Sequence, residues 1–135
     1  MFVLDERLAG DTHLVGDLPL CRVLLMNESR YPWLIAVPRQ AGLTEVTQLD
    51  ADARAQLWQD IERIAEGLPA LARFDKLNIG ALGNVVAQLH VHVVGRRRDD
   101  PAWPGPVWGH SPAVPYTQPQ VRTALETLRP ALSVE

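Results

Sequence analysis

Apolar residues in this chain come first in short runs, separated by polar residues, glycine and proline. Runs of four to eight apolar residues bounded by turn-forming residues are typical of β-strands. The expected strands are residues 13–20, 21–27, 33–37, 74–82 and 88–95. Pro19 interrupts the first of these and Pro38 ends the third, because proline has no N–H for a strand ladder. Gly83 and Asn84 predict a turn between the last two strands.

Between Asp50 and Leu71 the apolar spacing changes to three and four residues, which predicts a helix. The residues at this spacing are Ala53, Leu57, Ile61, Ile64, Ala65 and Leu68. Asp50 and Asp52 stand where carboxylates cap free N–H groups. A short second helix is expected over residues 119–129, after a proline-rich stretch without regular structure. Antiparallel strands around one long helix predict an α+β domain spanning residues 1–135.

Composition narrows the class of protein. Hydrophobic residues make up 47% of the chain, which is typical of a globular protein, and the net charge of -3 argues against a nucleic-acid partner. No apolar run approaches the ~20 residues of a membrane-spanning helix, so no membrane partner is expected. Cys21 is the single cysteine, which excludes an internal disulfide and favours a buried thiol. With acidic residues close to the start, these features predict a cytoplasmic protein.

The expected strand over residues 88–95 carries the chemistry, because its side chains alternate between two faces. The two sets are Leu89, Val91 and Val93 on one face, and Gln88, His90, His92 and Val94 on the other. The first set is aliphatic and is expected in the core, so the polar set faces a cleft or solvent. Two imidazoles about 7 Å apart on one face can reach the same small anion.

The two histidines alone also allow other interpretations of this strand. An isolated His-x-His pair on a strand is often half-exposed surface. The same spacing also occurs among metal ligands, and His13 or His110 could complete a zinc site. No third ligand lies nearby in the sequence, so no metal is assigned.

Residues 78–96 resemble the signature of the histidine-triad (HIT) family. They contain Asn78-Ile79-Gly80, a turn with Gly83, and Gln88-Leu89-His90-Val91-His92-Val93-Val94. The family signature has an Asn-x-Gly strand, a Gly-containing turn and three histidines that alternate with apolar residues. The order of strands and helix is also similar, so the resemblance extends loosely over residues 12–108. It implies a HIT-like fold with a nucleotide site.

Two positions depart from the family pattern. Gln88 stands where the family has its first histidine, and Val85 where many members have Ser or Thr near the phosphate. The chain therefore resembles a divergent, bacterial-type branch with Gln-x-His-x-His in place of His-x-His-x-His.

The resemblance implies a catalytic role for each polar residue of the strand. His90 would attack the α-phosphorus and form a nucleotidyl-imidazole that water then cleaves, while its other ring nitrogen donates to a backbone carbonyl. His92 would donate to a phosphate oxygen. Gln88 can donate a hydrogen bond to a leaving group but cannot protonate it. Good leaving groups, as in dinucleoside polyphosphates, are therefore the expected substrates.

The resemblance also suggests substrate contacts. Asn78 matches the strand asparagine that contacts phosphate or the leaving group, and Asn27 lies where a ribose contact is expected. Backbone N–H groups near Gly83 and Asn84 could bind phosphate. Each has a simpler reading as a capping, turn or hairpin residue.

Two further groups have open roles. Three consecutive arginines, residues 96–98, predict a solvated face, or a site that attracts the outer phosphates. Trp103 and Trp108 are held in a proline-rich loop, either as a clasp over the sheet or as an aromatic wall near the nucleotide. His110 has no predicted role. HIT family members often dimerise, so a homodimer is expected.

These observations predict a nucleotide hydrolase or transferase that acts through His90, with no required cofactor. A divalent cation could accompany a polyphosphate substrate. The alternatives are a nucleotide-binding module with weak or no catalysis, because Gln88 replaces a histidine, and a metal-dependent hydrolase.

Overall fold

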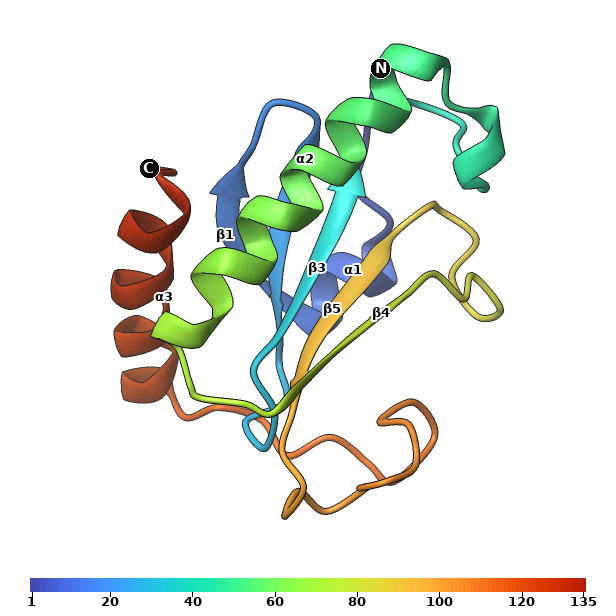
Figure 1. Ribbon diagram of the computed structural model, residues 1–135. Helices are drawn as coiled ribbons and strands as arrows, with labels where there is room; N and C mark the ends of the chain where they lie inside the picture. The colour runs from blue at the N-terminus through green and yellow to red at the C-terminus, as the bar shows by residue number, and fades with distance from the viewer.

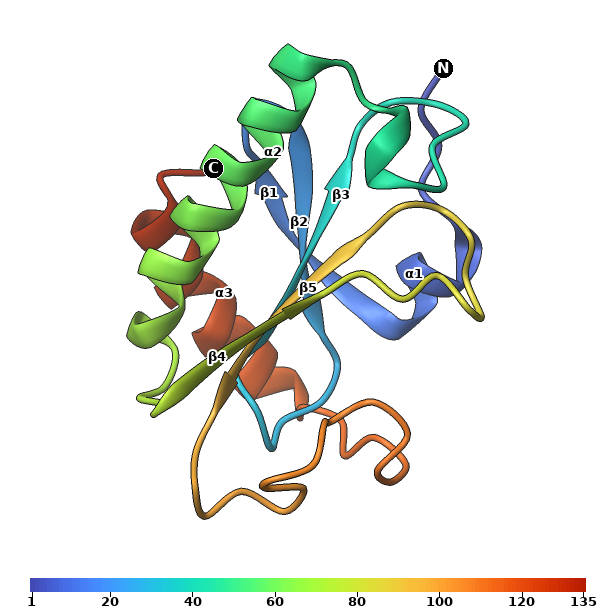
Figure 2. The ribbon, with the colours of Figure 1, turned by 45° about the vertical axis from the view of Figure 1, so that its right-hand side comes forward.

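The computed structural model describes residues 1–135 as a five-stranded antiparallel sheet with three helices. The strand order is β1-β2-β3-β5-β4. The strands are β1 Thr12–Asp17, β2 Cys21–Met26, β3 Trp33–Pro38, β4 Lys76–Gly80 and β5 Val91–Arg96. The helices are α1 Glu6–Asp11, α2 Ala51–Gly67 and α3 Gln118–Leu132. Helices α2 and α3 lie on one face of the sheet and α1 on the other (Figures 1 and 2). The predicted α+β class is confirmed.

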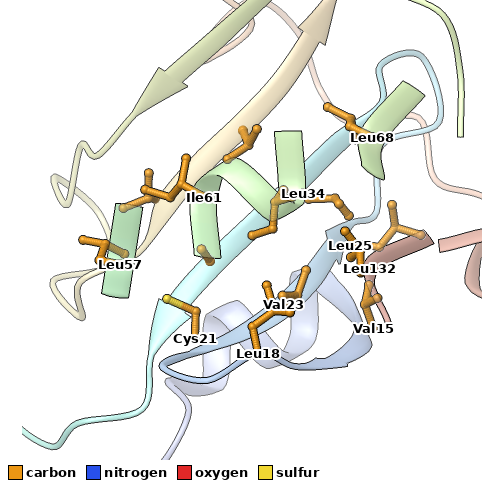
Figure 3. Close-up of a cluster of buried hydrophobic side chains, with 14 of the residues drawn as sticks. Val15, Leu18, Cys21, Val23, Leu25, Leu34, Leu57, Ile61, Leu68 and Leu132 are labelled. Carbon is orange, nitrogen blue, oxygen red and sulfur yellow. The ribbon is translucent and has the colours of Figure 1, made fainter. Parts of the chain in front are cut away.

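The main core lies between the sheet and helices α2 and α3. This core contains Val23 and Leu25 of β2 and Leu57 and Ile61 of α2, which Figure 3 labels among the buried side chains. The predicted helix is confirmed, and the Asp50 carboxylate caps it by accepting a hydrogen bond from the N–H of Ala53 at 2.8 Å. Burial of one helix face, rather than helix propensity, supplies most of the stability of such an element.

A smaller core lies on the opposite face of the sheet. Because side chains alternate along a strand, Trp33 and Ile35 of β3 point to this face, while Leu34 points into the main core. Val94 of β5 and Leu8 of α1 pack beside them. All six residues of β3 are buried, as expected for a strand covered on both faces. His90 and His92 lie on this second face, beside Trp33 and Ile35.

The segment between β4 and β5 differs from the expected hairpin. Strand β4 ends at Gly80 and β5 begins only at Val91, so a loop over residues 81–90 replaces the expected two-residue turn. The N–H of Leu89 donates to the carbonyl of Leu43, outside the sheet, at 2.9 Å. Residues 88–90 are therefore held by loops rather than by neighbouring strands, which is why β5 is shorter than predicted.

The other strand and helix boundaries differ from the predicted ones by a few residues. The first strand ends at Asp17, and the last helix extends to Leu132 with Pro130 inside it. The proline-rich stretch, expected to be irregular over residues 99–119, contains no helix or strand until α3 begins at Gln118. None of the helices has both the length and the apolar character needed to cross a membrane.

Candidate active site

A cavity of about 390 Å³ opens on the second face of the sheet. Its floor is the sheet, and its walls come from α1 and from two loops, residues 82–86 and 107–113. The floor and the apolar wall are formed by Leu8, Met26, Tyr31, Trp33, Ile35, His90, His92, Val107 and Trp108. An apolar cavity with a few polar groups is the usual form of a small-molecule site.

His90 lies on the cavity floor with 7% of its surface exposed. Its Nδ1 is 2.6 Å from the backbone carbonyl oxygen of Gln88. A carbonyl oxygen only accepts, so Nδ1 carries the proton and Nε2 keeps its lone pair. The contact between one ring nitrogen and a backbone carbonyl was predicted, and the structure shows it.

His92 lies beside His90 with ring centroids 4.9 Å apart. The indole Nε1–H of Trp33 donates to its Nδ1 at 3.0 Å. Burial, and then repulsion from His90, lower the pKa of His92 to about 4. His92 is therefore uncharged at neutral pH. Leu89, Val91 and Val93 face the main core and Val94 faces the second core, so the predicted alternation is confirmed from Leu89 to Val94.

The low pKa of His92 makes the stability of the protein depend on pH. The ordinary pKa near 6.5 applies in the unfolded chain, so between pH 6.5 and 4 the unfolded state binds more protons than the folded state. The free energy of unfolding is therefore unaffected by His92 well above pH 6.5. It falls as the pH falls through this range, by on the order of 2–3 kcal/mol at pH 4.5. Urea unfolding at several pH values measures it. His92→Gln should show a shallower pH dependence, and equal slopes would contradict the assignment.

Gln88 lies outside the lining of the cavity. Its amide Nε2 donates to the carbonyl of Val3 at 2.9 Å, and its Oε1 accepts from the N–H of Asp5 at 2.8 Å. Both halves of the amide are thus used by the N-terminal segment, in contrast with the expected contact to a leaving group. Gln88 instead anchors the backbone carbonyl that orients His90.

Asn27 and Asn78, whose side chains were predicted to contact substrate, do not line the cavity. The Oδ1 of Asn27 accepts from the N–H of Tyr116 at 3.0 Å, and the Oδ1 of Asn78 accepts from Arg96 at 2.9 Å. Arg96 is 1% exposed and paired with Asp100, which corrects the expectation of a solvated arginine. The other two arginines of the run are exposed.

The predicted loop residues do reach the cavity. Gly83 and Asn84 line it together with Val85, and Gly83 has a φ of 70°, a backbone conformation that favours glycine. Backbone N–H groups of such a loop are suited to bind an anion.

Trp108 forms part of the cavity wall, in agreement with one of its two predicted roles, that of an aromatic wall. Its ring centroid lies 5.4 Å from that of His92. The loop that carries it is fixed by Arg30, which donates to Ser111 and to the carbonyl of Pro112. Trp103 lies instead against Arg96, and His110 is exposed. No group of three or more His, Cys, Asp or Glu side chains could hold a metal ion.

Trp33 and the Glu28–Arg30 pair also line the cavity, and neither was predicted from the sequence. The alternation of β3 places Trp33 on the same face as Ile35. The register that brings Trp33 beside His92 is not visible in the sequence. Glu28 is buried and accepts two hydrogen bonds from the Arg30 guanidinium. It lies in the short segment between β2 and β3, where no sequence motif marks the pair.

Comparisons with known proteins identify the family of this chain. The HIT domain model matches residues 7–99. A crystal structure of a histidine triad protein from Marinobacter aquaeolei VT8 is 47% identical with a TM-score of 0.95, covering 98% of this chain and 97% of that chain. A HIT protein from Sinorhizobium meliloti 1021 is 46% identical with a TM-score of 0.93, covering 96% of both chains.

A histidine triad protein from Bradyrhizobium japonicum is 43% identical with a TM-score of 0.93, covering 97% of this chain and 98% of that chain. No curated protein matches the chain. Proteins of this family bind nucleotides and are generally nucleotide hydrolases or transferases, so membership supports such an activity in general. The family match and the close structural neighbours show that this chain belongs to the HIT domain family.

Proposed function

We propose that the protein is a hydrolase or transferase acting on the α-phosphate of nucleotides or dinucleoside polyphosphates through a nucleotidyl-histidine at His90. The observation that supports this most is the 2.6 Å contact between Nδ1 of His90 and the Gln88 carbonyl. It leaves the lone pair of Nε2 as the nucleophile in a buried, largely apolar cavity.

In the first step Nε2 of His90 attacks the α-phosphorus, and the bond from phosphorus to the leaving oxygen breaks with its electron pair on the leaving group. The imidazole becomes cationic as the P–N bond forms, and the Gln88 carbonyl stabilises that charge through the Nδ1 proton. Water, or another acceptor, then attacks phosphorus, and the P–N bond breaks with its electron pair returning to Nε2 of His90. The proton of the acceptor is released to solvent. His92 donates from Nε2 to a non-bridging oxygen, an interaction typically worth on the order of 3 kcal/mol in the transition state.

The position of Gln88 bears on the substrate. No side chain at that position supplies a proton to the departing group, because the Gln88 amide is bound to residues 3–5. A phosphate leaving group is stable as an anion and needs no such proton, whereas an amine does. We therefore favour phosphoric anhydrides over phosphoramidates. No cofactor is proposed beyond a divalent cation that a polyphosphate substrate could carry.

Mass spectrometry of rapidly quenched reactions tests the mechanism. Nucleotides and dinucleoside polyphosphates are first screened by thermal shift, and those that stabilise the protein are mixed with it and quenched in alkali, in which a phosphoramidate survives. The expected result is one nucleotidyl group on the peptide that contains His90. Turnover without an adduct, or an adduct on another residue, would contradict the mechanism.

A nucleotide-binding module with little catalysis is the second candidate, favoured by the same orientation of Gln88. It predicts thermal stabilisation by nucleotides with neither adduct nor product for any substrate of the panel.

A further inference from the structure

His92 is in contact with the indole of Trp33 on the neighbouring strand. In the antiparallel pair of β3 and β5, Trp33 lies opposite Val94 and Ile35 opposite His92. Trp33 and His92 are thus diagonal neighbours on one face, a distance that aromatic side chains span. Their ring centroids are 5.7 Å apart with an interplanar angle of 61°, and Nε1 of the indole is 3.0 Å from Nδ1 of the imidazole.

The direction of this hydrogen bond is fixed by chemistry. An indole N–H donates and never accepts, so Nδ1 of His92 must present its lone pair. The single proton of the neutral ring is then on Nε2. His90 is in the opposite state, because its Nδ1 faces a carbonyl and must carry the proton. Two histidines only two residues apart thus expose different groups at Nε2, a lone pair on His90 and an N–H on His92.

We propose that Trp33 is a positioning residue that holds His92 in its Nε2–H form, so that His92 always offers a hydrogen bond to the phosphate. This inference rests on the proposed function, in which His92 is the donor to the phosphate oxygen. A proton added to Nδ1 would face the indole N–H, with both groups buried, so the ring resists a second proton.

The surroundings of His92 support this assignment. Trp108 covers the ring on another side, and its own indole nitrogen is buried without a partner, so it imposes no tautomer. Besides His92, the titratable and charged side chains that line this cavity are His90, Arg7, Asp11, Glu28, Arg30 and Tyr31. Among them, His90 lowers the pKa of His92 further, after burial.

The tautomer can be read directly by NMR of the ¹⁵N-labelled protein, with His92→Gln identifying the His92 signals. Long-range ¹H–¹⁵N spectra should show a bare Nδ1 and a protonated Nε2, unchanged from pH 7.5 to 5.5. In Trp33→Phe the ring should populate both tautomers, and its titration midpoint should rise by about one pH unit, as expected for loss of one hydrogen bond. Trp108→Phe is the matched control and should keep the wild-type tautomer of His92.

Kinetics separate positioning from packing. Trp33→Phe should lower kcat on the order of tenfold, a typical cost of losing the partner that orients a functional histidine, with little change in KM. In the His92→Gln background the same substitution should change kcat by less than about twofold, since the two residues act through one contact.

Three results would overturn the proposal. The first is a proton on Nδ1 of His92 in the wild type, and the second is an unchanged tautomer of His92 in Trp33→Phe. The third is an equal loss of kcat in both backgrounds, which would make Trp33 a packing residue only. If the wild type shows no turnover, the proposed function fails, while the NMR measurement still decides the role of Trp33.

Discussion

Replacing His90 with alanine is expected to lower turnover at least about a thousandfold and to leave nucleotide binding within a few-fold of the wild type. The nucleophile contributes to the covalent step, whereas the cavity walls from α1 and the two loops supply most of the contact area for a ligand. Single-turnover kinetics on a dinucleoside polyphosphate measure the chemical step, and calorimetry with a nucleotide product measures binding.

Matched variants give this experiment its controls. His110→Ala removes an exposed histidine from the loop beside the cavity and should leave turnover unchanged. His92→Ala should still form the adduct, at a rate about a hundredfold lower, because it removes one transition-state donor rather than the nucleophile. Wild-type turnover in His90→Ala would rule out the mechanism.

Replacing Asp100 with alanine should destabilise the fold by about 3–5 kcal/mol, because it leaves the buried Arg96 guanidinium without its counter-ion. The side chains of both residues are 1% exposed, with the Asp100 oxygens 2.8 Å from Nε and 3.0 Å from Nη2 of Arg96. Asp100 also accepts from the backbone N–H groups of Ala102 and Trp103. Urea unfolding at pH 7.5 measures the loss.

The neighbouring residue supplies the control for Asp100. Asp99 pairs with Arg97 on the surface with 84% of its side chain exposed, so Asp99→Ala should change the free energy of unfolding by less than about 0.5 kcal/mol. The double replacement Arg96→Met with Asp100→Leu should recover much of the stability, because it removes both buried charges. An equal, small effect of Asp99→Ala and Asp100→Ala would show that the buried pair contributes little.

The Asp100 carboxylate also responds to pH. Burial raises its pKa, but hydrogen bonds from Arg96 and from the N–H groups of Trp103 and Arg97 outweigh burial and leave the pKa below its ordinary value. A depressed pKa stabilises the folded state above the ordinary value near 4, and that stabilisation is lost as the pH falls below it.

The sequence predicted those features that depend on local periodicity. The alternation from Leu89 to Val94 correctly separated core residues from the two cavity histidines, because one face of this segment is entirely aliphatic. The spacing of apolar residues likewise predicted α2, which buries the face containing Leu57, Ile61 and Ile64.

Features that depend on distant partners were not predictable. Helix α1 buries only Leu8, and its six residues are too few to show a period. The amide of Gln88 turns to residues 3–5, more than 80 positions away, which no local pattern records. Arg96 was predicted to be one of three exposed cations. Its burial follows from its ion pair with Asp100, which is visible only in the folded chain.

The aromatic lining of the cavity has an optical consequence. Two of the four tryptophans, Trp33 and Trp108, line the cavity, while Trp58 is exposed on α2 and Trp103 lies against Arg96. A nucleobase that enters the cavity comes close to two indoles and displaces water from them, whereas the other two act as a constant background. The intrinsic fluorescence of the protein therefore reports directly, without any label, on whether the cavity is occupied.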